Sequence, residues 1–195
     1  MATQLNINLT NFGVGGSTSN DFVNRYADIP LLNAVNENNY RLLTIEYGLN
    51  DAGTGVSLAT FRSNLENGIL NAKGKGWANY KIMLVNGNYC TTVGLITALQ
   101  PYAEEVIKIA KEQGVQYSDI YNYTKNNGGG LLLSDGIHPT AAGGVVYARG
   151  VIASMYGGGE FSNSLTVVNK IKSGGIISDG DMSLKGVISG DVTKV

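Results

Sequence analysis

Residues 80–89 read Tyr80-Lys81-Ile82-Met83-Leu84-Val85-Asn86-Gly87-Asn88-Tyr89. The short apolar run Tyr80–Val85 predicts a strand that is buried in a sheet. The polar residues Asn-Gly-Asn follow it directly and predict a loop. Apolar residues at helical spacing then run from Thr97 to Gln113, and Gly114 provides a C-terminal stop. This stretch therefore predicts a strand, a polar loop and a helix in that order.

The same order recurs on both sides of residues 80–89. The other predicted strands are Gln4–Leu9, Arg41–Tyr47 and Val115–Ile120. The other predicted helices begin near Asp21, cover Ser57–Lys73, and run from a Thr140 cap to about Met155. Alternation of this kind is typical of a parallel sheet with helices on both faces. We therefore expect an α/β protein with a three-layer α/β/α sandwich.

In such a sheet, the loops that follow the carboxyl ends of the strands gather at one edge and form the functional site. Here these loops are rich in glycine and polar residues, and they contain Gly15-Gly16, Asn50-Asp51, Asn86-Gly87 and Asp135 with His138. We expect these loops to converge.

His138 is the single histidine of the chain, and it follows Asp135 by three positions in a predicted loop. A carboxylate can fix the tautomer of an imidazole and stabilise its protonated form, as a general base acting on a hydroxyl requires. The alternative is a surface loop in which Asp and His are incidental neighbours.

Two further loop residues carry suitable hydrogen-bond donors. The backbone N–H of Gly16 and the side-chain amide of Asn50 could stabilise the oxyanion that develops during acyl transfer. A tight turn at Gly16 and helix N-capping by Asn50 and Asp51 are the structural alternatives.

Three segments resemble, in order and spacing, signature blocks of the SGNH (GDSL-type) hydrolases. They are Asn11–Thr18, Gly48–Asp51 and Asp135–Pro139. The resemblance covers about Leu5 to Ser154, and it implies an α/β/α esterase that often removes acetyl groups from carbohydrates with a Ser-His-Asp triad. It further implies that His138 and Asp135 are catalytic, that Gly16 and Asn50 form the oxyanion hole, and that no metal or other cofactor takes part.

The first block of that family, Gly-Asp-Ser after the first strand, has no counterpart before Gln4–Leu9. In the strand order 2-1-3-4-5, that strand lies in the middle of the sheet, so its absence would expose two strand edges. Three arrangements could fill this gap. Another polypeptide or a second copy of the chain could supply the strand and the serine, or the fold could close without them. Alternatively, the C-terminal tail could return to the missing position, as in a circular permutation. Ser183, in Gly-Asp-Met-Ser-Leu, and Ser17, beside Gly16, are the weaker candidates for the nucleophile within the chain.

The predicted SGNH hydrolase-like domain covers residues 1–156. Residues 157–195 form a second segment, in which short β-leaning runs alternate with glycine-rich turns. Such runs are stable when they stack against other chains, which predicts an assembly segment. Their texture resembles bacteriophage tail and fibre proteins, which would place the chain in a virion or outside the cell.

Composition limits the classes of function. A net charge of −1 gives no electrostatic reason for binding nucleic acid or an anionic membrane. No run approaches the roughly 18 apolar residues that span a bilayer, and Met1–Thr10 has no secretory signal pattern. Cys90, the single cysteine, excludes an internal disulfide.

The sequence thus favours an esterase that acts on acylated carbohydrate. The competing hypothesis is a catalytically inactive module of the same fold that binds carbohydrate or builds a virion. For that module, Tyr89, Tyr121 and Tyr123 could stack on sugars, although ordinary packing is the alternative for these rings.

Overall fold

The computed structural model describes residues 10–25 and 40–155. In chain order, the elements are α2 (Ser19–Arg25), β1 (Leu43–Glu46), α4 (Leu49–Thr54), α5 (Leu58–Gly74), the 3₁₀ turn η2 (Asn79–Lys81), β2 (Ile82–Val85), α6 (Leu95–Gln113), β3 (Gln116–Ser118), α7 (Ile120–Asn126), the 3₁₀ turn η3 (Gly129–Leu132) and α8 (Ala141–Ala153).

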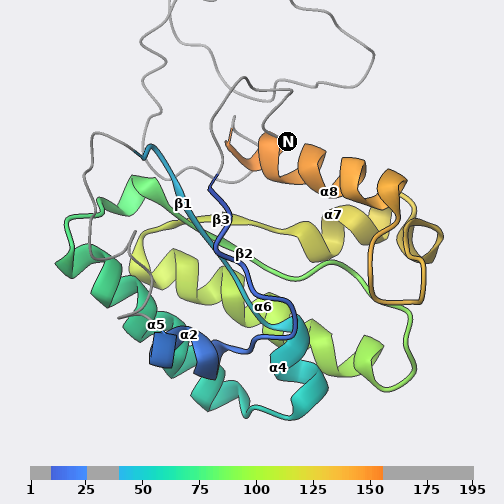
Figure 1. Cartoon of the computed structure of the whole chain (residues 1–195), viewed down its shortest axis with the longest axis horizontal. Helices are drawn as coiled ribbons and strands as arrows, with labels where there is room; N and C mark the ends of the chain where they lie inside the picture. The colour runs from blue at the N-terminus through green and yellow to red at the C-terminus, as the bar shows by residue number, and fades with distance from the viewer. Residues whose placement is uncertain (1–9, 26–39, 156–195) are drawn as a thin grey trace, which may run out of the picture. The chain divides into compact units, whose positions relative to one another are not determined.

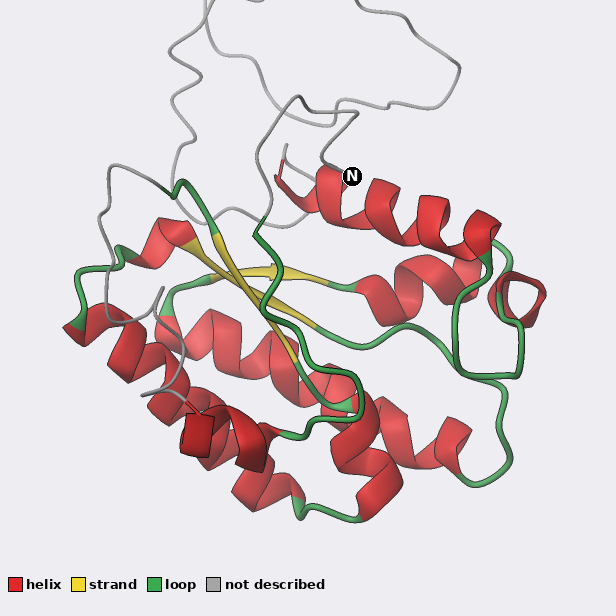
Figure 2. Cartoon of the chain, viewed as in Figure 1, coloured by secondary structure: helices red, strands yellow, loops and turns green. Residues whose placement is uncertain are grey.

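The three strands form a parallel sheet in the order β1-β2-β3 (Figure 2). Leu43 is opposite Ile82 at the start of the first pair, and Met83 is opposite Gln116 at the start of the second. Because the strands are parallel and adjacent in sequence, α4 to α6 must carry the chain back between them. The predicted parallel α/β fold is confirmed.

Strand β2 separates two apolar layers because successive side chains of a strand point to opposite faces. Ile82 and Leu84 pack in the cluster that contains core residues of α5 and α6. Met83 and Val85 pack instead with Ile120 of α7 and Val151 of α8. Figure 1 shows α5 and α6 on one side of the strands and α8 on the other. This is the predicted α/β/α layering.

The helix predictions are accurate to within a few residues. Ser57 caps α5 by accepting a hydrogen bond from the backbone N–H of Thr60, and Gly114 ends α6 with a left-handed φ of 64°. Thr140 caps α8, as predicted, by accepting from the backbone N–H of Gly143. These local signals act within one turn of helix, which is why the sequence is sufficient to place them.

The strands are shorter than predicted. Tyr80 and Lys81 belong to η2 rather than to β2. Ile120 already belongs to α7, because the Asp119 carboxylate accepts a hydrogen bond from the backbone N–H of Asn122 and starts that helix. Side-chain capping by Asp competes with strand extension here.

Several predictions lie outside the described residues. They are the strand Gln4–Leu9, the tail 157–195 and Ser183. Within residues 10–25 and 40–155, β1 pairs with β2 alone, so its other edge has no strand from the described part of the chain.

Candidate active site

Asp135 and His138 lie in the loop between η3 and α8. The Oδ2 atom of Asp135 lies 2.7 Å from Nδ1 of His138. Both side chains are open to solvent, with exposed fractions of 54% for Asp135 and 74% for His138. The two residues that the sequence paired are therefore in direct contact, and the imidazole is accessible.

The Asp135 carboxylate is held in its ionised form. Its Oδ1 atom accepts the backbone N–H groups of His138, at 2.8 Å, and Ile137, at 3.0 Å. The hydrogen bond from the His138 backbone, followed by that from the His138 ring and that from Ile137, lowers the pKa of Asp135 to about 2. An ionised carboxylate can only accept, so neutral His138 carries its proton on Nδ1 and leaves Nε2 available as a base.

The base of this loop is closed by a short antiparallel bridge. Leu133 pairs with Pro139, and the backbone N–H of Ser134 donates to the His138 carbonyl at 2.8 Å. The Ser134 hydroxyl donates to the same carbonyl at 3.0 Å. The backbone on both sides of the Asp-His pair is thus fixed.

The Asn50 side chain reaches the loop that contains Gly16. Its Nδ2 atom donates to the Ser17 carbonyl oxygen at 3.0 Å, and Gly16 has a φ of 79°, so it forms the predicted tight turn. Asn50 does not cap a helix, because α4 begins one residue before it and Gly48 occupies the N-cap position. Within residues 10–25 and 40–155 this is the one hydrogen bond that the amide donates, and since an amide carries two N–H donors, the second is available to a ligand.

Asp51 was expected as a possible helix cap, and its carboxylate also accepts hydrogen bonds from Ser19 of α2. Its side chain is fully buried, and its Oδ2 atom accepts the backbone N–H of Gly48 at 3.2 Å. Its Oδ1 atom accepts both the backbone N–H and the hydroxyl of Ser19, at 2.9 and 2.6 Å. Asn64 of α5 donates to the same hydroxyl at 3.0 Å. Asp51 therefore ties α2, which follows the Gly16 loop, to α4.

The loop after β2 connects the two halves of the candidate site. A Cβ atom on Gly87 would lie 3.2 Å from Cβ of Leu49, so the chain passes close to the start of α4. One residue further, Nδ2 of Asn88 donates to the Ile137 carbonyl at 3.0 Å. The start of α4, which contains Asn50, and the loops of Asn88 and His138 are consequently neighbours, as the topology predicted. The sequence did not single out Asn88, because an Asn in a loop carries no signal for its partner.

The described residues contain no nucleophile in position. Within residues 10–25 and 40–155, no side chain makes a hydrogen bond to Nε2 of His138. The Ser17 hydroxyl donates instead to the Val14 carbonyl at 2.8 Å. Ser17 therefore remains a candidate without geometric support.

The tyrosines proposed for sugar stacking are used in packing. The rings of Tyr89 and Tyr121 meet edge to face, with centroids 5.8 Å apart, and Tyr121 is buried. A Cβ on Gly150 of α8 would lie 2.7 Å from the ring of Tyr123, so that ring is packed closely as well. These contacts agree with ordinary packing.

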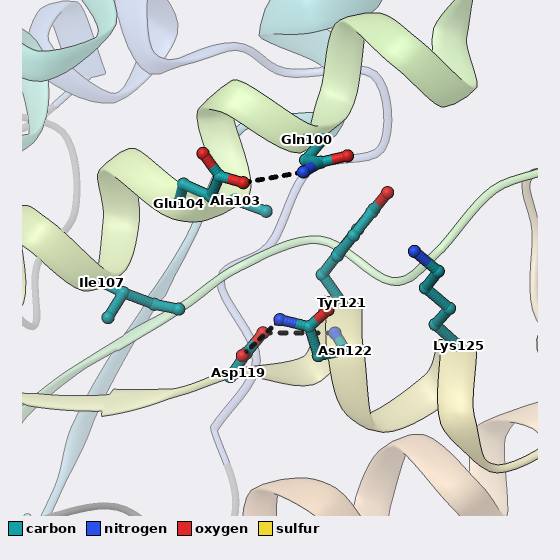
Figure 3. A pocket seen from close by; sticks show the side chains of 8 residues that line it. All are labelled: Gln100, Ala103, Glu104, Ile107, Asp119, Tyr121, Asn122 and Lys125. Carbon is teal, nitrogen blue, oxygen red and sulfur yellow. Dashed lines mark hydrogen bonds between the residues drawn. The ribbon is translucent and has the colours of Figure 1, made fainter.

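Tyr121 also lines a pocket between α6 and α7 (Figure 3). The pocket does not include Gly16, Asn50, Asp135 or His138. Its residues are Gln100, Ala103, Glu104, Ile107, Asp119, Tyr121, Asn122 and Lys125. It is therefore separate from the candidate active site.

A parallel α/β/α sandwich with an Asp-His pair beyond the carboxyl ends of its strands is an architecture of hydrolases. The family model of the GDSL-like lipases and acylhydrolases matches residues 1–144, so the chain belongs to the GDSL-like lipase/acylhydrolase family.

Solved structures share this fold. Axe2, an acetylxylan esterase from Geobacillus stearothermophilus, is similar with a TM-score of 0.62 and 21% identity over 75% of this chain and 71% of that chain. A catalytic mutant of Axe2 is similar with a TM-score of 0.63 and 20% identity over 78% of this chain and 74% of that chain. The structure of TesA is similar with a TM-score of 0.61 and 19% identity over 79% of this chain and 82% of that chain. A comparison with curated protein sequences finds no match.

In the part of the chain that the structure describes, no helix has the length and apolar character of a membrane span. Nor do residues 10–25 and 40–155 bring together three or more His, Cys, Asp or Glu side chains in a way that could hold a metal ion. Cys90 is buried, and burial raises the pKa of its thiol.

Proposed function

We propose that this chain is the acid-base half of an esterase that removes acyl groups, acetyl among them, from carbohydrate. The observation that carries the proposal is the 2.7 Å contact between Asp135 and an exposed His138, in a loop that the loop after β2 joins to the first turn of α4, which carries Asn50. This arrangement leaves a general base and an amide donor on the same edge of the sheet.

The reaction follows the acyl-transfer scheme. Nε2 of His138 removes the proton of a serine hydroxyl, and the serine oxygen attacks the ester carbonyl. The oxyanion of the tetrahedral intermediate accepts hydrogen bonds from the Gly16 N–H and the free N–H of Asn50. When the intermediate collapses, the C–O bond to the sugar breaks and His138 returns the proton to the sugar oxygen. Water, activated by His138, then releases the carboxylic acid and restores the serine.

The serine of this scheme comes from outside the described residues. Within them, Nε2 of His138 has no hydroxyl partner, and the edge of β1 carries no second strand. We propose that a strand with the serine, from another polypeptide or a second copy of the chain, completes the sheet beside β1. Ser183 remains the weaker source within the chain.

The carbohydrate part of the proposal rests on similarity and on exposure. Axe2 is an acetylxylan esterase with the same fold. The open position of His138 also suits an ester group on the surface of a large polymer, because a polymer cannot enter a closed pocket.

The second candidate function is an inactive module of the same fold that binds carbohydrate or serves a virion. The absence of a hydroxyl on Nε2 among the described residues favours it. The upstream nucleotide sequence offers an inexpensive test, because an in-frame or neighbouring Gly-Asp-Ser would favour the enzyme.

A serine-reactive phosphonate probe on the native assembly is the direct test. Labelling of one serine, abolished by His138→Ala, would identify the nucleophile and support the esterase. If the assembly that contains the chain takes no label and hydrolyses no acetyl ester, the inactive module is correct.

A further inference from the structure

Two of the three peptide groups in the turn from Asp135 to His138 are held at both ends. The first joins Gly136 to Ile137, and the second joins Ile137 to His138. Their N–H groups both donate to Oδ1 of Asp135. The Asp135 carboxylate therefore holds the N–H ends of both peptides in its own loop.

The carbonyl ends of the same two peptides are held from outside the loop. The Gly136 carbonyl accepts the backbone N–H of Thr91 at 2.8 Å, and the Ile137 carbonyl accepts Nδ2 of Asn88 at 3.0 Å. Both donors belong to the loop after β2. Gly136 itself has a φ of 86°, and a Cβ there would lie 3.0 Å from the hydroxyl of Thr91, so the two loops lie close together.

Asn88 connects this exposed turn to the buried end of the sheet. Its side chain is 6% exposed and it lies three residues after β2, in which every residue is buried. The same Nδ2 atom also donates to the Tyr89 carbonyl at 2.9 Å, and the Tyr89 N–H donates to the Thr124 hydroxyl at 3.0 Å. The amide of Asn88 is thus held in place by contacts other than its hydrogen bond to Ile137.

We propose that Asn88 is a positioning residue for the Asp135–His138 pair, acting through the Ile137 carbonyl. The peptide that it holds leads directly into His138, so its orientation sets the direction of the imidazole. The inference rests on the proposed function for its consequence in catalysis, whereas the effect on the geometry of the pair is independent of that function. Thr91 contributes through its backbone and cannot be tested by a side-chain substitution.

The test compares Asn88→Asp and Asn88→Ala with Asn79→Asp in the full chain. Asn88→Asp keeps the shape of the side chain but replaces the donor by a carboxylate that would face a carbonyl oxygen. Asn79→Asp is the matched control, because Nδ2 of Asn79 also donates to a backbone carbonyl, that of Gln113, but before the amino end of β2.

The readout is spectroscopic and needs no activity. Because His138 is the single histidine, the ¹⁵N shifts of one imidazole, measured through its carbon-bound protons at about pH 9, report its tautomer. The carboxyl ¹³C shift of Asp135, followed as the pH is lowered, reports the pKa of that group, for which we expect about 2 in the wild type.

In both Asn88 variants we expect a mixture of tautomers and an Asp135 pKa closer to its ordinary value of 3.8. In Asn79→Asp, both signals should match the wild type. In the assembled enzyme, the Asn88 variants should lose on the order of 10- to 100-fold in kcat with little change in KM.

Wild-type tautomer and Asp135 pKa in folded Asn88 variants would overturn the inference. So would loss of the fold in both variants, because Asn88 would then be needed for folding rather than for positioning. If the spectra change but the assembly hydrolyses no ester, the positioning role stands and the proposed esterase function fails.

Discussion

The amide Nδ2 of Asn50 donates a 3.0 Å hydrogen bond to the carbonyl oxygen of Ser17, 33 residues earlier in the chain. This bond joins the first turn of α4 to the tight turn at Gly16. The two oxyanion donors of the proposed mechanism are therefore held in one unit before any substrate arrives, as electrostatic preorganisation requires.

Replacement of Asn50 by Asp should remove the donor and place a negative charge where the oxyanion develops. We expect the kcat of the assembled enzyme on an acetyl ester to fall by about 10²- to 10³-fold. The fold should remain, because the buried Ser19–Asp51 contacts hold the same elements together. An unchanged kcat in Asn50→Asp, or an equal loss in Asn79→Asp, would contradict an oxyanion role.

Asp51→Asn should reduce stability rather than chemistry. The buried carboxylate accepts three hydrogen bonds, and an amide group would turn its N–H toward one of those donors. The cost should be about 1–3 kcal/mol in the free energy of unfolding. Urea denaturation followed by circular dichroism measures it. Glu66→Gln, which removes a partly exposed carboxylate from α5, should cost about 1 kcal/mol or less, and equal losses in both variants would contradict the prediction.

His138→Ala and Asp135→Asn should abolish catalysis while leaving the fold intact. Both side chains are largely exposed, so neither change leaves a cavity. We expect Asp135→Asn to lower kcat by about 10⁴-fold, because an amide no longer selects the Nδ1-protonated tautomer. Steady-state kinetics on p-nitrophenyl acetate tests this prediction. Residual activity within tenfold of the wild type would show that the pair is not the general base.

The low pKa of Asp135 predicts a dependence of stability on pH. Its pKa is about 2 in the folded chain, against an ordinary value of 3.8. A carboxyl group with a lowered folded-state pKa stabilises the fold above about pH 4, and this contribution disappears as the pH falls from about 4 to 2. The free energy of unfolding should therefore fall less steeply in Asp135→Asn across that interval. Parallel slopes for the two proteins would show that the carboxylate has the same pKa when folded and unfolded.

Gly143 and Gly144 offer a matched pair at the start of α8. A Cβ on Gly143 would lie 2.2 Å from the carbonyl oxygen of Leu132, whereas a Cβ on Gly144 would meet nothing within 4 Å. Gly143→Ala should therefore displace η3 from α8 and cost about 1–3 kcal/mol. Gly144→Ala should be neutral or stabilise by about 0.4–1 kcal/mol. Thermal unfolding measured by calorimetry compares them, and equal effects would show that η3 does not pack closely on α8.

Local signals in the sequence determined much of this fold. Apolar runs and caps such as Thr140 and Gly114 act over a few residues, so they placed α5, α6, α8 and the centres of the described strands, whereas the short helices α4 and α7 were not predicted. The contact between Asp135 and His138 belongs to the same class. The two residues are three positions apart, and a short loop between them is enough to bring a carboxylate to an imidazole.

The tertiary structure decided which distant groups meet. Asn50 reaches Ser17, Asn88 reaches Ile137 across 49 residues, and Asp51 becomes a buried acceptor for Ser19. Each of these contacts depends on the register of β1 with β2 and on the packing of helices against the sheet. An Asn or Asp after a strand has the same local signature whether it caps a helix, faces solvent or supports a catalytic loop, and only the assembled sheet distinguishes these roles.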